Sequence, residues 1–386
     1  MRIVFTGSGT GGHFYPLIAI AEAVREQASS KRLLAPEMYF LGPDPFDQQA
    51  LFENKIAFVA TPAGKVRRYF SLKNVSDFFV TIRGVISALI SLVSIYPDVV
   101  VSKGGYTTVP VTVAANILRI PVIIHESDAK PGRANLFAAP RAYRIAITFD
   151  TARVFFPKKV QDRIALTGIP IRREIAYVDA QGAQEELHLD RAVPTIFILG
   201  GSSGSQRINE VVLSALPDLV SFANIIHQTG KDNFTDVEAT SKVILGKSEH
   251  AIRYHAFPYL NAQSMRRAAG AATLVISRAG ATAIYEISLW KKPAILIPIP
   301  EAISHDQRTN AYSFAQTGAA VVLEEANLTP HVLASEAKRI ATDATLVQTM
   351  GEKGGAFANP NAANVIAEEI LSIGIEHAST TSKSNV

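Results

Sequence analysis

Cysteine is absent from all 386 residues of this sequence. Its absence excludes disulfide bonds, thiol catalysis and cysteine metal ligands, and it fits a reducing compartment. A large surplus of one charge is missing too, because 38 basic and 34 acidic residues leave a net charge of only +4, which does not imply nucleic acid as a partner. Neither His125–Glu126 nor His305–Asp306 has a third ligand at metal-site spacing, so we predict no metal and no cofactor.

Long apolar segments are scarce as well. Residues 1–5 lead directly into a glycine loop, so no cleavable signal peptide is predicted. One stretch, 78–96, is a candidate membrane span, but it contains Arg83 and its apolar residues recur at helical spacing. We interpret it as an amphipathic helix that either packs against the core or lies at an interface.

Short apolar runs alternate with helical patterns through most of the chain, which is 48% hydrophobic. The predicted strands are 3–5, 37–41, 58–60, 98–102, 121–124, 145–147 and 163–166, followed by 195–199, 224–226, 252–255, 271–276, 294–298 and 319–323. This alternation predicts parallel sheets covered by helices on both faces. The predicted fold class is therefore α/β, with two doubly wound Rossmann-like domains that face each other across a cleft.

Breakers and polar residues suggest where the domains divide. Residues 168–173 contain glycine and proline and precede a polar stretch, so we place the domains at 1–167 and 168–358. A C-terminal helix over 359–374 could return to the first domain. The tail, 375–386, is rich in serine and threonine and is expected to be disordered.

Two glycine-rich loops follow predicted strands, at 7–12 and 200–205. Glycines there allow backbone N–H groups to approach a phosphate at a helix N-terminus. The first loop has the G-x-G-x-x-G spacing, but a dinucleotide site also needs an acid about 20 residues on, and Asp44 comes later. A tight turn, or a loop for another oxygen-rich ligand, remains open, and in the second loop the Ser202 hydroxyl could add a donor.

Three single residues have both a functional and a plain structural interpretation. His13 follows the first glycine loop and is either a cap or core residue, or a general base. Glu286 lies one turn into the helix after strand 271–276 and is either a solvated carboxylate or an acceptor for two ribose hydroxyls. Arg172 is either a solvated charge or a partner for a diphosphate.

Several motifs occur together and in a fixed order. They are Gly9-Thr-Gly-Gly-His13, Gly104-Gly-Tyr106, His125-Glu-Ser-Asp-Ala-Lys-Pro-Gly132 with Asn135, Gly168-Ile-Pro-Ile-Arg172, Gly200-Gly-Ser-Ser-Gly-Ser-Gln-Arg-Ile-Asn209, His227-Gln-Thr-Gly230, Ser277-Arg-Ala-Gly-Ala281 with Glu286, and Gln307 with Asn310-Ala311. This ordered set covers roughly residues 1–373 and resembles the MurG family, the bacterial glycosyltransferases that make lipid II.

The resemblance implies a GT-B fold and a metal-free, inverting transfer. The donor would be UDP-N-acetylglucosamine, and the acceptor would be the muramoyl 4-hydroxyl of lipid I, the undecaprenyl-diphosphate-linked N-acetylmuramoyl-pentapeptide. Other possibilities are a GT-B transferase with another lipid acceptor, a UDP-sugar epimerase, or a silent UDP-sugar binding protein. An NAD-dependent oxidoreductase is the weakest alternative.

The resemblance also implies roles for particular residues. His13 would be the general base, with Asp128 as the alternative. Arg172 and Ser202 would meet the donor nucleotide, and Glu286 the ribose. The remaining substrate contacts that it implies are Thr10, Gly11, Gly12, Tyr106, Phe257, Ala281, Thr282, Asp306 and Gln307.

Three positions depart from the family pattern. Asp128 stands where many members have Asn, Ala283 replaces a Thr, and Asp306 replaces a possible second Gln. These departures concern recognition of the sugar more than of the nucleotide.

The lipid of such an acceptor lies in a membrane. The resemblance therefore implies a peripheral protein at the cytoplasmic face of the cell membrane, with an apolar and basic surface on the first domain that contacts anionic lipid. The residues that could form this surface are Lys65, Arg67, Arg68, Tyr69, Phe70, Leu72, Lys73 and the helix that follows. Ordinary core packing of that helix is the alternative.

Overall fold

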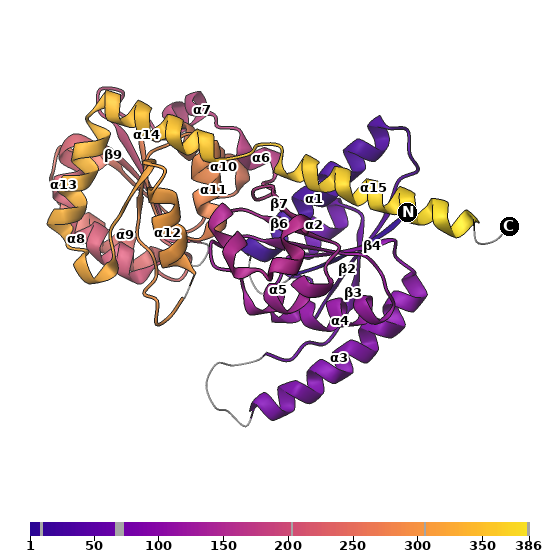
Figure 1. Cartoon of the computed structure of the whole chain (residues 1–386). Helices are drawn as coiled ribbons and strands as arrows, with labels where there is room; N and C mark the ends of the chain where they lie inside the picture. The colour runs from indigo at the N-terminus through magenta and orange to yellow at the C-terminus, as the bar shows by residue number, and fades with distance from the viewer. Residues whose placement is uncertain (8–10, 66–72, 202–203, 305, 384–386) are drawn as a thin grey trace. The chain divides into compact units, whose positions relative to one another are not determined.

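The computed structural model describes residues 1–7, 11–65, 73–201, 204–304 and 306–383, which form two compact units (Figure 1). The first unit contains residues 1–172 together with the segment from Pro360 onward, and the second contains Arg173–Asn359. Each unit is built on one parallel β-sheet, so the predicted α/β fold class with two doubly wound sheets is confirmed.

The sheet of the first unit has seven strands in the order β3-β2-β1-β4-β5-β6-β7. The strands are β1 Arg2–Thr6, β2 Glu37–Gly42, β3 Ile56–Ala60, β4 Val99–Ser102, β5 Val122–Glu126, β6 Arg144–Ile147 and β7 Ile164–Leu166. The helices are α1 Gly11–Ser30, α2 Gln48–Glu53, α3 Lys73–Ile95, α4 Val109–Ile117, α5 Arg133–Ala138 and α15 Ala362–Lys383, with 3-10 turns η1 Tyr106–Thr108, η2 Ala139–Arg141, η3 Asp150–Phe155 and η4 Lys158–Arg163.

Alternate residues of these strands enter two separate cores. Ile3 and Phe5 of β1 pack with apolar residues of α1 and α15, whereas Val4 packs with residues of α3 and α4. Successive side chains of a strand point to opposite faces, so a continuous apolar run is buried on both sides when helices cover both faces. This explains why residues 3–5 of β1 and residues 99–101 of β4 are continuous apolar runs rather than alternating ones.

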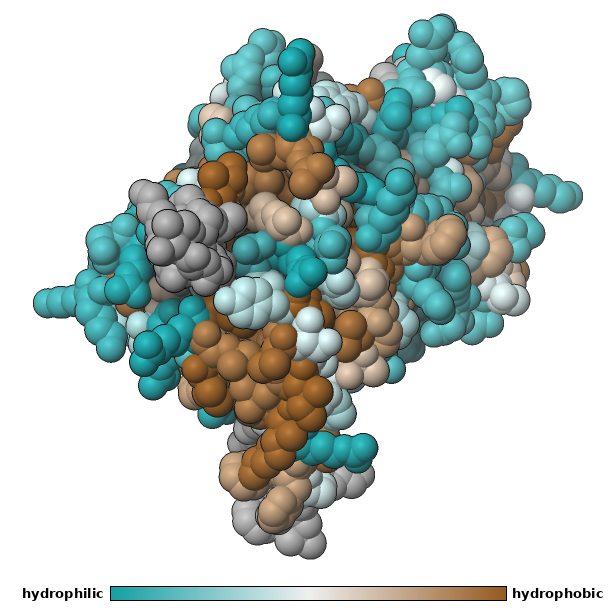
Figure 2. Space-filling view, turned by 90° about the vertical axis from the view of Figure 1, so that its right-hand side faces the viewer, coloured by the Kyte–Doolittle hydropathy of each residue, from teal (hydrophilic) through white to brown (hydrophobic). Residues whose placement is uncertain are grey.

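The helix α3 presents its apolar stripe to solvent. Its inner line, Gly84, Ala88, Leu92 and Ile95, is buried, and a Cβ added at Gly84 would lie 2.0 Å from the Pro62 carbonyl oxygen. The apolar side chains of the outer line are 42–67% exposed; they are Phe78, Phe79, Ile82, Ile86, Ile90 and Val93. Figure 2 shows apolar residues gathered along the lowest part of the molecule, where Figure 1 places α3.

Length and composition would allow α3 to cross a membrane. Among the described residues, the only such helix is the segment Ser76–Ile95, and 17% of its most apolar window is buried. Core packing, one of the two alternatives that the sequence allowed, therefore accounts for the inner line of α3 and not for its outer line.

The C-terminal helix α15 packs against α1 within the first unit. Gln27 Nε2 donates to the Asn364 carbonyl oxygen at 2.8 Å, and Ile366 and Ile370 enter the same core as Leu17. The helix continues to Lys383, whereas the sequence predicted its end at 374 and a disordered tail beyond. Extending an established helix by one residue costs little compared with starting one, so weak helix formers can follow it.

The sheet of the second unit has six strands in the order β10-β9-β8-β11-β12-β13. The strands are β8 Thr195–Leu199, β9 Asn224–Gln228, β10 Tyr254–Phe257, β11 Leu274–Ser277, β12 Ala294–Leu296 and β13 Ala320–Val322. The helices are α6 Arg173–Ala176, α7 Ala180–Glu186, α8 Gln206–Phe222, α9 Phe234–Leu245, α10 Ala262–Ala271, α11 Ala281–Leu289, α12 Gln307–Ala315, α13 Pro330–Ala341 and α14 Ala344–Phe357, with 3-10 turns η5 Ala251–Arg253 and η6 Glu325–Asn327.

Side-chain caps mark where helices of the second unit begin. Ser205 accepts a hydrogen bond from Ile208 N at the start of α8, Asn261 accepts from Ser264 N before α10, and Asp343 accepts from Leu346 N before α14. Each cap satisfies one of the free N–H groups of a first helical turn. The apolar side of α8 then packs with α13 on one face of the sheet, for example through Leu216 and Leu333.

Candidate active site

Neighbouring strands of the first unit end beside several polar residues. The sheet pairs β1 with β4 and β4 with β5, so the chain segments after these strands leave the same edge. His13 comes from the start of α1, Lys103 directly follows β4, and His125 and Glu126 end β5. The structure thus brings together three predicted motifs of the first half of the chain.

Lys103 is the buried cation of this group. Its side chain is only 2% exposed, and its Nζ lies 2.8 Å from His125 Nδ1 and in hydrogen-bond contact with Ser127 Oγ. Burial lowers the pKa of Lys103 to about 8, and the charges of Glu126 and Asp128 oppose that shift.

The two histidines are held in the neutral form. Burial, and after it the charge of Lys103, lower the pKa of His13 to about 4. The same two causes, in the same order, lower the pKa of His125 well below its usual value. His125 Nε2 lies 2.8 Å from the Gly168 carbonyl oxygen, which requires a donor, so its Nδ1 is the acceptor for the Lys103 ammonium.

Glu126 organises the loop that carries Asp128. Its carboxylate accepts hydrogen bonds from Asp128 N, Gly132 N and Asn135 Nδ2, each at 2.9 Å. Burial raises the pKa of Glu126, while these hydrogen bonds oppose that rise. The backbone of Asp128 is therefore fixed, and its partly buried side chain lies within electrostatic range of Lys103.

The other predicted residues of the first unit lie around this group or near it. Gly11 and Gly12 begin α1, and Tyr106 begins η1 after two glycines with positive φ. The Arg172 guanidinium lies over the Tyr15 ring, 4.0 Å from its centroid, and Tyr15 Oη donates to Asp47. Thr10 lies outside the described residues.

In the second unit, the turn after β8 is shaped by glycine. Gly201 and Gly204 have φ of 91° and 77°, and a Cβ at Gly204 would lie 2.1 Å from the Thr229 carbonyl oxygen. No other residue fits there without moving the backbone of the neighbouring loop. The turn leads into the N-terminus of α8, whose free N–H groups and dipole favour an anion. Ser202 lies outside the described residues.

Arg278 links three of the loops at this edge. Its Nη2 donates to Ser205 Oγ at 2.6 Å, and its Nη1 donates to the Ile297 carbonyl oxygen at 3.2 Å and pairs with Glu325 Oε1 at 2.5 Å. The strands β8, β11 and β12 are neighbours, so one guanidinium can hold the segments that follow all three. The side chain is 12% exposed, which leaves it a structural tie under the loops.

The other predicted residues of the second half, all of them among the described residues, follow strands of this sheet. Ala281 and Thr282 begin α11, and Glu286 is partly buried one turn further on. Asp306 is the residue before α12, and Gln307 Oε1 accepts from Ile299 N at 3.2 Å.

Phe257 ends β10, and its carbonyl oxygen accepts a hydrogen bond from Thr229 N at 2.9 Å. This bond joins the segments that leave β9 and β10. The Thr229 hydroxyl also donates to the same carbonyl oxygen, at 3.2 Å.

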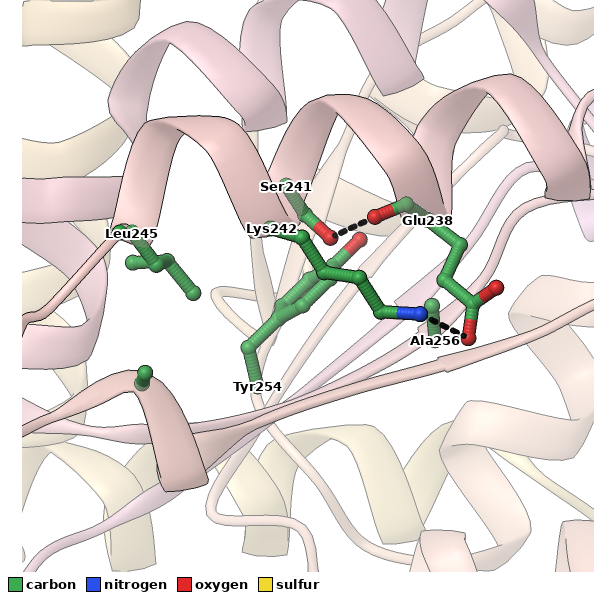
Figure 3. A pocket seen from close by; sticks show the side chains of 8 residues that line it. Glu238, Ser241, Lys242, Leu245, Tyr254 and Ala256 are labelled. Atoms are coloured by element: carbon green, nitrogen blue, oxygen red, sulfur yellow. Dashed lines mark hydrogen bonds and ion pairs between the residues drawn. The ribbon is translucent and has the colours of Figure 1, made fainter.

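A cavity of about 310 Å³ lies elsewhere in the second unit, between α9 and β10 (Figure 3). It is flanked by the Glu238–Lys242 ion pair and by Tyr254, and its lining includes none of the predicted site residues. Tyr254 Oη bonds His227 Nδ1 at 3.0 Å, and His227 Nε2 bonds Asn209 Oδ1 at 3.0 Å. Burial lowers the pKa of His227 to about 3, so this histidine of the His227-Gln-Thr-Gly230 motif is a neutral core residue.

Sequence reasoning did not single out Lys103 or Arg278 as individual residues, although Arg278 lies inside a motif that it used and Lys103 directly precedes another. A lysine or arginine directly after a buried strand and before glycine or alanine was the available signal. Such a residue has no room to reach solvent unless the chain turns outward, which only the structure decides.

Comparison with known families matches both halves of the chain. The model of the glycosyltransferase family 28 N-terminal domain matches residues 3–147, and that of the C-terminal domain matches residues 195–367. A Bacillus anthracis protein named UDP-N-acetylglucosamine–N-acetylmuramyl-(pentapeptide) pyrophosphoryl-undecaprenol N-acetylglucosamine transferase 2 is 35% identical over 342 residues, covering 88% of this chain and 91% of the relative. A Clostridium botulinum transferase of the same name, without the number, is 37% identical over 85% of this chain and 87% of its own length.

Solved structures show the same fold across nearly the whole chain. The crystal structure of Acinetobacter baumannii MurG matches with a TM-score of 0.74 at 24% identity, covering 96% of this chain and 99% of that one. A putative UDP-N-acetylglucosamine 2-epimerase from Listeria monocytogenes matches with a TM-score of 0.66 at 14% identity, covering 95% and 94%. Transferases and epimerases share this fold, so the fold alone does not distinguish the two activities.

Proposed function

This chain belongs to the MurG family within glycosyltransferase family 28, and from that membership we propose that it transfers N-acetylglucosamine from UDP-N-acetylglucosamine to lipid I. The acceptor atom is the muramoyl 4-hydroxyl oxygen, and the product is lipid II of peptidoglycan synthesis. The observation that carries this proposal is a relationship along nearly the whole chain to transferases of that name. The Listeria monocytogenes epimerase shares the fold at only 14% identity.

The reaction needs a base near the acceptor and stabilisation of the leaving group. The acceptor oxygen attacks C1 of the sugar, the bond from C1 to the diphosphate oxygen breaks, and UDP leaves with the bonding electrons. The acceptor proton passes to the base, and attack from the opposite side inverts C1. The reaction therefore requires one site with a titratable base and a second site that binds the anionic diphosphate.

We assign the base to His13, with Asp128 as the alternative. A pKa of about 4 leaves His13 neutral at neutral pH, which is the protonation state in which a general base starts the reaction. Gly11, Gly12 and Tyr106 belong to the segments next to it and are assigned to the acceptor and the sugar. Asp128, in the loop after β5, is the other titratable group that we consider for this role.

We assign the donor to the edge of the second sheet. The glycine turn and the N-terminus of α8 supply N–H groups for the diphosphate, and Arg172 supplies a cation. The Glu286 carboxylate accepts from the ribose hydroxyls, and Gln307 and Asp306 meet the sugar. The segments at Phe257 and at Ala281–Thr282 complete the nucleotide site.

Access to a lipid acceptor requires contact with a membrane, and we assign this membrane contact to α3. Its exposed apolar stripe is the kind of face that inserts at a lipid interface, and Arg83 and Lys65 are exposed cations near it in the sequence. Attraction to anionic lipid at the cytoplasmic face follows from those charges. Arg67, Arg68, Tyr69, Phe70 and Leu72, also predicted for this surface, lie outside the described residues, and the side chain of Lys73 is not described.

Incubation of the protein with UDP-N-acetylglucosamine and a soluble lipid I analogue tests the proposal. The expected result is UDP together with an acceptor whose mass has increased by one N-acetylhexosamine, and much less product from UDP-glucose. Conversion of the donor into its C2 epimer, or donor binding without any product, would contradict it.

A further inference from the structure

Arg172 is the cation that we assign to the diphosphate, and an aromatic ring directs its side chain. The guanidinium is partly buried and lies over the Tyr15 ring, 4.0 Å from the ring centroid. No other cation in the described part of the chain lies as close to an aromatic ring. A long side chain such as arginine loses much rotamer freedom when it is fixed, so an arginine that is already held loses less when a ligand binds.

The Tyr15 ring is itself confined by its neighbours. A Cβ added at Gly11 would lie 3.2 Å from two carbon atoms of the ring, so the backbone at the start of α1 lies directly against it. Phe46 meets the ring edge to face, with centroids 6.0 Å apart and an angle of 88° between the planes. Phe14 does the same at 5.5 Å and 75°. These contacts restrict the ring to the position in which it meets Arg172.

Asp47 fixes the far end of the same tyrosine. Tyr15 Oη donates to Asp47 Oδ2 at 3.1 Å, and Asp47 Oδ1 accepts from Ala50 N at 3.0 Å as the N-cap of α2. One carboxylate thus joins a helix cap to the tyrosine hydroxyl. A phenylalanine would supply the same ring without this bond, so the hydroxyl orients the ring and does not itself hold the arginine.

This arrangement lies within the first unit, whose first segment ends at Arg172. Tyr15 follows His13 by two residues in α1, so the ring that directs the cation stands on the helix that carries the proposed base. A ring contact brings no oxygen acceptor to the guanidinium. It therefore positions the charge without neutralising it, as a residue that binds an anion requires.

We propose that Tyr15 is a positioning residue that holds the Arg172 guanidinium ready for the diphosphate of the donor, with Asp47 orienting the Tyr15 ring. This role rests on the proposed function. Tyr15 does not need to touch either substrate, because it acts through Arg172. The competing role is ordinary packing of an aromatic residue at the start of α1.

Tyr15→Leu tests the role, because leucine is apolar but has no ring. Arg172 must then be ordered as the diphosphate binds, so affinity for UDP should fall by about 3–10-fold. Uridine lacks the diphosphate, so its affinity should not change. Calorimetry with the two ligands measures both quantities. An unchanged UDP affinity, or equal losses for UDP and uridine, would overturn the proposal.

Two further variants separate the ring from the hydroxyl and from the rest of the site. Tyr15→Phe keeps the ring and should retain most of the UDP affinity. Arg172→Met should weaken UDP binding by itself, and Tyr15→Leu added to it should cause no further loss, because the ring then has no guanidinium to hold. The proposal would be refuted by a Tyr15→Phe variant as weak as Tyr15→Leu, or by additive losses in the double variant.

Tyr143→Leu is the matched control. The Arg144 guanidinium also lies over a tyrosine ring, 4.8 Å from the Tyr143 centroid, but this pair lies at the start of β6 and the arginine is bound to Glu369 of α15. This variant should leave the affinities for UDP and uridine unchanged. A selective loss of UDP affinity as large as that of Tyr15→Leu would show that the effect does not depend on Arg172.

NMR of the intact wild-type protein makes the test independent of the folding of any variant. The Nε–Hε signal of Arg172, assigned by its loss in Arg172→Lys, should be shifted upfield by the ring current of Tyr15. A signal at the position of an unstructured arginine would overturn the proposal, and so would a wild-type protein that binds UDP no more tightly than uridine. A wild-type protein that prefers UDP but transfers no sugar would contradict the proposed function alone.

Discussion

At the carboxyl edge of the first sheet a lysine, two histidines and a glutamate lie together, whereas the same edge of the second sheet consists of glycine-rich turns, helix N-termini and one arginine held by three partners. At the first edge burial shifts the pKa of the lysine, of both histidines and of the glutamate, whereas at the second edge a guanidinium that stays charged ties the loops together. The same parallel-sheet architecture thus offers a site suited to proton transfer in one unit and a site suited to an anion in the other.

His13→Ala should have the largest effect, and only on turnover. Loss of a general base lowers kcat by about 10²–10⁴-fold, while donor affinity should be unchanged because the donor is assigned to the second unit. Steady-state kinetics and calorimetry with UDP-N-acetylglucosamine measure the two quantities separately.

The control for this variant is His331→Ala, at an exposed position of α13, which should leave both quantities unchanged. Near-normal turnover of His13→Ala together with an inactive Asp128→Asn would move the base to Asp128. The base would still belong to the first edge in that case, since Asp128 lies in the loop after β5.

Arg278→Ala should come next, with its effect on stability and donor binding. It leaves Glu325, whose side chain is 19% exposed, without its cation and frees Ser205. The free energy of unfolding should fall by about 2–3 kcal/mol, and donor affinity should fall with it as the glycine turn loosens.

Arg339→Ala is its matched control, because Arg339 pairs with Glu336 on an exposed helix surface, with the arginine side chain 53% exposed. Chemical denaturation should show a change of at most about 1 kcal/mol for this variant. Equal destabilisation by the two substitutions would refute the view that Arg278 holds the loops together.

Glu286→Ala should weaken donor binding by about 2–3 kcal/mol, because it removes paired hydrogen bonds to a charged acceptor. Stability should hardly change, since the side chain is only partly buried. Calorimetry with UDP measures the effect, and unchanged affinity would leave Glu286 an ordinary surface carboxylate.

The smallest effects should come from α3. Ile86→Ser and Ile90→Ser remove exposed apolar side chains and should each weaken binding to anionic vesicles by about 1 kcal/mol, with no change in turnover on a soluble acceptor. Val243→Ser, at an 81% exposed position of α9 in the second unit, is the control. Sedimentation with anionic vesicles at low and high salt measures this binding. If the wild-type protein does not bind vesicles, α3 is not a membrane-contacting helix.

The sequence predicted the two sheets, because strand periodicity and glycine-rich turns are local signals. It could not tell which side of α3 packs, since both Ile86 and Ala88 are apolar and only the close approach to Pro62 selects the small residues. It could not foresee that Lys103 would be enclosed by residues 22 and 24 positions away. Such contacts depend on the order of strands in the sheet, which no local pattern encodes.

The configuration of the new glycosidic bond tests the central claim most directly. Proton NMR of the product formed from UDP-N-acetylglucosamine and a lipid I analogue reports the anomeric coupling constant. A β-linked N-acetylglucosamine on the muramoyl 4-oxygen is expected, since a base at the first edge activates the acceptor for attack opposite the leaving UDP. An α-linked product, or a UDP-sugar altered at C2 with the acceptor unchanged, would contradict the account.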